Sequence, residues 1–171
     1  MRHAPIRVLV VTLALGAHPT LAQETRTLGA HEHGHVTLQV AISGDAVEAV
    51  LAAPGADIVG FEHAPEGEAQ VAAVEAARAA LSDPANVLIL PGEAGCMADA
   101  ASAVLHQEGA HAAFEVTHRL ACADTAAIDG IGTRLFDLYP SIAEIDVEYV
   151  TPAGQGAGAL TPGTALVLPS N

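Results

Sequence analysis

The sequence predicts an α+β fold: a mostly antiparallel sheet with one main amphipathic helix, a short second helix and one disulfide. Three observations predict it. Several short segments alternate apolar and polar residues, one longer segment repeats apolar residues at helical spacing, and Pro and Gly residues separate the segments. Strands interrupted by a single long helix are typical of α+β domains.

The predicted sheet begins with a β-hairpin. Residues 36–43 alternate apolar and polar side chains, Ser43-Gly44-Asp45 supplies turn residues, and a period of two resumes over residues 47–51. Pro54-Gly55 ends this hairpin, and we expect residues 56–65 to form a short loop.

The main helix is predicted over residues 66–81. Val71, Val74 and Leu81 stand at helical spacing, and the acidic residues come early, where the helix dipole favours them. Asp83-Pro84 is expected to stop this helix. The apolar run over residues 87–90 then predicts a short buried strand.

The second half of the chain is predicted to supply the rest of the sheet. Residues 95–110 are rich in Ala, Gly and Ser, so we expect a loop there, whereas residues 114–122 alternate and predict a strand. A short helix is expected after Gly132, where the spacing of apolar residues is helical. Residues 145–149 predict a further strand, residues 151–154 a turn, and residues 159–160 and 166–168 extended pieces.

The first 22 residues have the pattern of a secretory signal peptide. Arg2 and Arg7 precede an apolar stretch over residues 8–17, and Thr20-Leu21-Ala22 places small residues before the expected cut. The apolar stretch is far shorter than the roughly 20 residues of a membrane span. We therefore expect residues 23–171 to be one exported domain, in the periplasm, with no membrane span after signal removal.

The charge balance excludes one class of partner and favours another. The chain of 171 residues has six Arg, no Lys and 20 acidic residues, for a net charge of −14. Nucleic-acid binding is excluded because nothing here neutralises a run of phosphates. The negative field would instead attract divalent cations.

The two cysteines are Cys96 and Cys122. An even count in an oxidising compartment favours one disulfide. Closing a loop of about 27 residues would stabilise the fold by roughly 3 to 4 kcal/mol through lost chain entropy. The alternative is that both thiolates are metal ligands, which requires protection from oxidation.

The strongest candidate for chemistry is the run His31-Glu32-His33-Gly34-His35. In extended backbone, residues i and i+2 share one face about 6.6 Å apart, so two of these imidazoles could bind one ion with a ligand from elsewhere. All three could share an ion only if Gly34 bends the chain. Zinc suits a set of imidazole and carboxylate ligands, and Cu²⁺ or Ni²⁺ would also bind such a cluster.

Three other histidines are candidate ligands. His63 precedes the main helix, where it could reach a site or simply pack. His111 lies before the second-half strand and could capture metal loosely. His118 falls on the apolar side of that strand, which is typical of a satisfied core histidine, although a ligand role stays open.

No enzyme motif of the common kinds is present, so we predict that the protein is not an enzyme. The main hypothesis is a Zn²⁺ carrier or buffer that uses the histidine cluster. One alternative is an interaction module whose acidic surface docks a transporter component, with incidental histidines. A second is a metal-dependent hydrolase with Glu32 or Glu62 as general base, which would require a cleft around the metal.

Several short blocks together resemble the ZrgA-like family of zinc-regulated periplasmic proteins. The similarity spans essentially all of residues 23–171, and the blocks that carry it are residues 31–42, 59–65 (VGFEHAP), 95–96, 120–124 (LACAD), 135–140 (LFDLYP) and 150–155 (VTPAGQ). The resemblance implies a periplasmic zinc-binding protein that supports zinc acquisition, alongside a zinc importer. The residues that match its motifs are His31, His33, His35, Glu62, His63, Cys96 and Cys122.

The chain departs from this family in one place. Members carry a long run of alternating His and Asp or Glu before the second-cysteine strand, whereas here that stretch holds only His106, Gln107, Glu108 and His111. A loose zinc sponge is therefore not expected. The site around the N-terminal triplet should dominate, with His118 or His63 as a third ligand.

Overall fold

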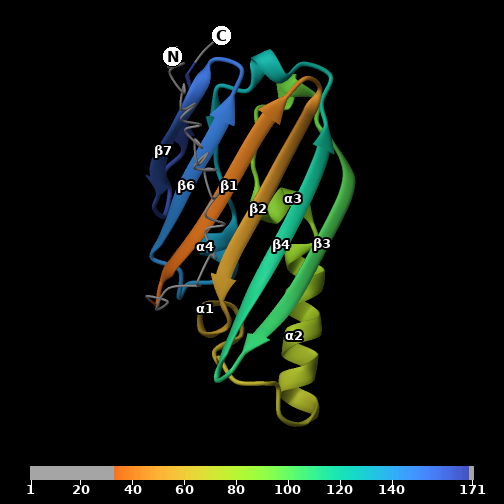
Figure 1. Ribbon diagram of the computed structural model, residues 1–171, viewed down its shortest axis with the longest axis vertical. Coiled ribbons are helices and arrows are strands. Elements are labelled where there is room, and N and C mark those ends of the chain that lie inside the picture. Colours follow the sequence, from red (N-terminus) through yellow and green to blue (C-terminus); the bar gives the residue numbers. More distant parts are fainter. Residues whose placement is uncertain (1–32, 170–171) are drawn as a thin grey trace, which may run out of the picture.

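The computed structural model describes residues 33–169 of the chain. Its larger sheet has six strands, which are, in their order across the sheet, β3 (Met97–Glu108), β4 (His111–Ala121), β2 (Ala46–Pro54), β1 (His35–Ser43), β6 (Glu144–Thr151) and β7 (Gly154–Leu160) (Figure 1). All neighbours are antiparallel except β1 and β6, which run parallel. The predicted α+β fold with a mostly antiparallel sheet is confirmed. The expected signal peptide, residues 1–22, lies outside the described residues.

One face of this sheet is buried and the other is open. The hairpin β1–β2 has the predicted alternation, so that every second side chain of β1 enters the core and the intervening ones face solvent. The same holds for β4 and for the first half of β6. The buried face forms a single core with the helices and the irregular segments, and its largest fully buried side chains include Phe114, Leu38, Leu51, Leu81, Ile131, Leu135, Ile145 and Leu160.

Two helices follow the hairpin. Helix α2 (Gly67–Leu81) confirms the predicted main helix and buries Val74, Ala77 and Leu81. The segment before it was expected to be a loop throughout, but it begins with a short helix, α1 (Gly55–Val59), directly after β2 ends at Pro54.

The predicted strand over residues 87–90 is wrong. Val87 is the last residue of a short helix, α3 (Pro84–Val87), and of residues 88–90 only Ile89 pairs, in an isolated bridge with Gly132. Asp83 accounts for the start of this helix, because its Oδ1 accepts a hydrogen bond from the Ala85 N–H at 3.0 Å and caps it. Pro84 suits the first helical position, where no N–H is needed.

The expected loop over residues 95–110 is also wrong, because most of it is β3. Its side chains are almost all exposed, and the Ala and Ser residues show no alternation of apolar and polar character. This edge strand is held by backbone pairing with β4 along its whole length. The predicted disulfide is confirmed: Cys96 and Cys122 join the start of β3 to the end of β4, next to the short 3-10 helix η1 (Gly92–Ala94).

The remaining elements close the fold. They are η2 (Thr125–Ala127), β5 (Gly130–Ile131), α4 (Leu135–Leu138) and β8 (Leu166–Val167), and β5 pairs with β8 in a small separate sheet. The predicted short second helix after Gly132 is confirmed by α4. The predicted strand over residues 145–149 is confirmed within β6. Among the described residues, no helix has the length and apolar character needed to cross a membrane.

Candidate metal centre

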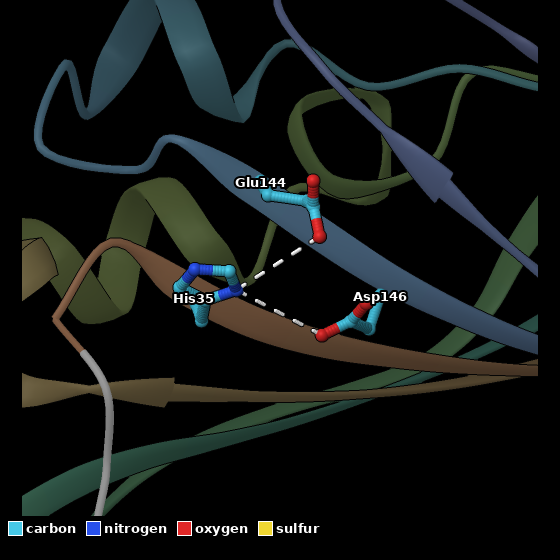
Figure 2. A group of neighbouring side chains, drawn as sticks. All are labelled: His35, Glu144 and Asp146. Atoms are coloured by element: carbon cyan, nitrogen blue, oxygen red, sulfur yellow. Dashed lines mark ion pairs between the residues drawn. The ribbon is translucent and has the colours of Figure 1, made fainter.

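A histidine and two carboxylates meet where β1 and β6 begin, at the lower end of the sheet in Figure 1. Figure 2 shows that the side chains of His35, Glu144 and Asp146 point toward one another. The distance from His35 Nδ1 is 3.9 Å to Glu144 Oε1 and 4.0 Å to Asp146 Oδ2. Ligand atoms of all three residues lie within 4.8 Å of one another, and this is the one such group within residues 33–169.

The parallel pairing of β1 with β6 produces this cluster. His35 is the register partner of Glu144, and Thr37 is the partner of Asp146. Since alternate residues of a strand share a face, His35, Glu144 and Asp146 all stand on the open face of the sheet. Their side chains are 41%, 37% and 56% exposed, so an ion has free access from solvent.

Gly34 fixes the start of β1. Its φ of +85° is a left-handed conformation that favours glycine, and its carbonyl oxygen accepts hydrogen bonds from the Ala143 and Glu144 N–H groups at 2.8 and 3.0 Å. Its own N–H donates to Oδ1 of Asp57, a buried carboxylate on α1, at 2.9 Å. The chain therefore turns sharply between His33 and His35.

This turn sends His33 to a different partner. His33 Nε2 donates to Glu62 Oε1 at 3.1 Å, and His111 Nδ1 donates to Glu62 Oε2 at 3.0 Å. Glu62 thus stands between two histidines, in the loop that joins α1 to α2. The hydrogen bond from His111 lowers the pKa of the Glu62 carboxyl, as do the hydrogen bond from His33 and the charges of both rings, while partial burial opposes the shift.

The other predicted ligands lie elsewhere. His118 is buried in the core, where its Nε2 donates to the Leu81 carbonyl at 2.9 Å, and burial lowers its pKa although that hydrogen bond and the nearby Asp83 oppose the shift. His63 is exposed, stacks on Phe61 with ring centroids 5.1 Å apart, and donates from Nδ1 to the carbonyl of Ala64. His31 lies outside the described residues.

The structure therefore divides the histidines that the sequence groups together. His35 meets two carboxylates, whereas His33 and His111 meet Glu62. Neither His118 nor His63 lies in either group. Glu144 and Asp146 are not predicted as ligands from the sequence, although their alternation with the apolar Ile145 and Val147 marks them as outward-facing. Their proximity to His35 depends on the parallel pairing, for which the sequence holds no local signal.

The donor set of the His35 cluster suits a divalent metal ion. Metal–ligand bonds of about 2.0 to 2.2 Å place neighbouring ligands of a tetrahedral zinc site about 3.3 Å apart. The observed separations of 3.9 and 4.0 Å are slightly longer and could close through small side-chain rotations. Three protein ligands would leave a fourth position for water.

Comparisons with known proteins agree with this chemistry. Residues 30–168 match a protein family described as ZrgA family zinc uptake protein. That description names zinc uptake and no enzymatic reaction. No curated protein matches the sequence.

Proposed function

The chain belongs to the ZrgA family of zinc uptake proteins, and from this premise we propose that it is a periplasmic Zn²⁺ carrier or buffer. The single observation that carries the proposal is the cluster of His35, Glu144 and Asp146 on the open face of the sheet. One zinc ion bound there would take one imidazole nitrogen and two carboxylate oxygens as ligands. Cu²⁺ and Ni²⁺ are competing ions that the same donors could accept.

The charge of the cluster supports a cation as its ligand. Two carboxylates stand side by side with a histidine, and none of the ion pairs within residues 33–169 joins an Arg to either of them. Neighbouring like charges repel, and a divalent ion between them removes that repulsion. The net charge of −14 adds a long-range attraction for cations.

The surroundings of the cluster favour a carrier over a hydrolase. A hydrolase requires a pocket that holds the substrate against the metal. The groove on the open face is lined by residues further along the strands, and His35, Glu144 and Asp146 are not among those residues. A carrier needs only an accessible ion site, which the exposure of these side chains provides.

Export to the periplasm rests on two features. The first 22 residues have the pattern of a signal peptide. The Cys96–Cys122 disulfide suits an oxidising compartment. Cell fractionation, with N-terminal sequencing of the exported protein, tests this part of the proposal. A protein that begins at Gln23 in the periplasmic fraction is expected, and an uncut chain retained in the cytoplasm would contradict it.

Calorimetric titration of the purified protein with Zn²⁺ tests the metal site. The double variant His35→Ala with Asp146→Asn should lose one zinc-binding step. The matched control is Glu148→Gln, which removes a carboxylate two residues further along the same face of β6, where its partner is Gln39 rather than a histidine. A titration unchanged in the double variant would overturn the proposed site, and parallel titrations with Cu²⁺ and Ni²⁺ would rank the metals.

A further inference from the structure

We propose that His33, Glu62 and His111 form a second Zn²⁺ site, separate from the His35 cluster. The proposal deepens the zinc-carrying function and rests on it only for the identity of the ion. It assigns two ions, rather than one, to the lower end of the sheet.

Each distance from a histidine nitrogen to Glu62 is in the range found between two ligands of one zinc ion, but the ligand atoms of all three residues do not lie within 4.8 Å of one another, so the rings must move to share an ion. His33 Nε2 and His111 Nδ1 lie 3.1 and 3.0 Å from the Glu62 oxygens. Neighbouring ligands in a tetrahedral zinc site are about 3.3 Å apart, and two histidines, one glutamate and a water form a familiar zinc ligand set. The two rings contact opposite oxygens of the carboxylate, so an ion would draw both nitrogens toward a common point.

The exposure of the two histidines allows this movement. Their side chains are 69% and 66% exposed, whereas that of Glu62 is only 20% exposed. Exposed rings change rotamer at little cost because few neighbours confine them. Glu62 is therefore the fixed ligand, and the histidines close on the ion from two sides.

The negative charge of the Glu62 carboxylate also favours binding of a cation. Among residues 33–169, the ion pairs of Glu62 are with His33 and His111 alone, and no arginine pairs with this carboxylate. Arg78 and Arg119 pair with other carboxylates. A divalent ion at this position would neutralise Glu62 and replace the two hydrogen bonds with metal–ligand bonds, and the proton of each donating nitrogen would leave to solvent or move to the other nitrogen of its ring.

Two backbone features hold the three residues together before any ion binds. At Gly55, an added Cβ would lie 2.6 Å from the Phe61 carbonyl oxygen and 2.9 Å from that of Ala112. The absence of a side chain thus lets the segment before Glu62 approach the start of β4, where His111 stands. The hydrogen bond from the Gly34 N–H to the buried Asp57 holds the backbone next to His33.

Stoichiometry and residue-level spectroscopy test the second site. Calorimetry of the purified protein should show two zinc ions, and Glu62→Gln should reduce this number to one. The matched control is Glu66→Gln, an exposed carboxylate in the same loop that forms none of the ion pairs with a histidine within residues 33–169. In the His35→Ala, Asp146→Asn background, Zn²⁺ should still shift the imidazole NMR signals of His33 and His111.

The outcomes separate this proposal from the proposed function. If Glu62→Gln leaves the zinc stoichiometry unchanged and Zn²⁺ does not shift the NMR signals of His33 and His111, the second site is overturned. The hydrogen bonds to Glu62 would then have only a structural role. If the double variant leaves the stoichiometry unchanged but Glu62→Gln lowers it, the second site is supported and the His35 site is overturned. Should Glu62→Gln unfold the protein, His33→Gln with His111→Gln provides the same test, since both side chains are exposed.

Discussion

The His35 cluster and the group of His33, Glu62 and His111, here called the Glu62 cluster, lie at the same end of the sheet and use the same kinds of donor, yet they are built differently. The three residues of the His35 cluster stand on two paired strands, and their nitrogen-to-oxygen separations are 3.9 and 4.0 Å. Those of the Glu62 cluster come from a turn, a loop and the start of a strand, and the separations are 3.1 and 3.0 Å. In the His35 cluster, the paired strands keep the ligand atoms apart. In the Glu62 cluster, the turn and loop allow the ligand atoms to form hydrogen bonds.

This difference indicates how each cluster should respond to an ion. Neighbouring strands lie about 4.8 Å apart, so the backbone of β1 and β6 holds His35 next to the two carboxylates, and only small side-chain rotations are needed to close on an ion. The Glu62 cluster must exchange two existing hydrogen bonds for metal bonds. With two carboxylates and a preorganised backbone, the His35 cluster is expected to bind zinc more tightly than the Glu62 cluster.

The largest expected effect separates fold stability from metal binding. Replacing Cys96 and Cys122 with Ser should lower the free energy of unfolding by about 3 to 4 kcal/mol, because the bridge closes a loop with a sequence separation of 26 residues. Both clusters lie at the opposite end of β4 (Figure 1). Denaturant titration checks the stability, and the zinc stoichiometry of the folded variant should not change. If the Cys96 and Cys122 variant lost a zinc-binding step, the disulfide at one end of β4 and the metal clusters at the other end would be energetically coupled.

The second-largest effect is expected on the affinity of the His35 cluster for zinc. Asp146→Asn removes one charged ligand and should weaken zinc binding at this cluster by at least about 10- to 100-fold, the range known for loss of a group that merely supports a metal ligand. Competition against a chromophoric chelator measures the change. Glu148→Gln is the control, and equal weakening in both variants would mean that only the overall charge of the face matters.

Gly34→Ala tests the turn that divides the two clusters. The left-handed φ of +85° should cost a non-glycine residue about 1 to 2 kcal/mol, and the new Cβ would lie 3.3 Å from the Ser141 carbonyl oxygen. Since Gly34 separates His33 from His35, both zinc steps should weaken together. Thermal unfolding and calorimetry check this expectation, and a variant with one unaffected step would show that the turn positions only one cluster.

The smallest effect concerns His118, the buried histidine. Because burial lowers its pKa in the folded protein below the usual 6.5, the unfolded chain binds a proton first as the pH falls. Its contribution to stability is therefore complete above pH 6.5 and is lost below it, by at most about 1.4 kcal/mol per pH unit. His118→Gln can keep a donor for the Leu81 carbonyl without titrating, so its unfolding free energy should depend less on pH. If the unfolding free energies of the wild type and of His118→Gln changed equally with pH, His118 would not be the source of this pH dependence.

The parts of the fold that sequence reasoning predicted are those that bury one face. The strands β1, β2 and β4 and the helix α2 each place apolar residues at the period of their own backbone, and that period can be read locally. The strand β3 exposes Ala and Ser on both faces, so its strand character comes from pairing with β4 and leaves no pattern in the sequence.

The candidate site was predictable only in part for a related reason. The histidines are visible in the sequence, but their partners come from pairings between distant segments. Glu144 reaches His35 through a parallel register between strands about 100 residues apart, a kind of connection with no local signal. Glu62 reaches His111 because Gly55 allows two backbone segments to approach closely. Gly34 was recognised as the point where the triplet could bend, yet the bend separates His33 from His35.

Diffraction from zinc-loaded crystals, with data collected at the zinc absorption edge, tests the central claim most directly. We predict an anomalous peak about 2.0 to 2.2 Å from His35 Nδ1 and from carboxylate oxygens of Glu144 and Asp146. A second, weaker peak is expected beside Glu62. Zinc-loaded crystals with no anomalous peak at His35 would contradict the account.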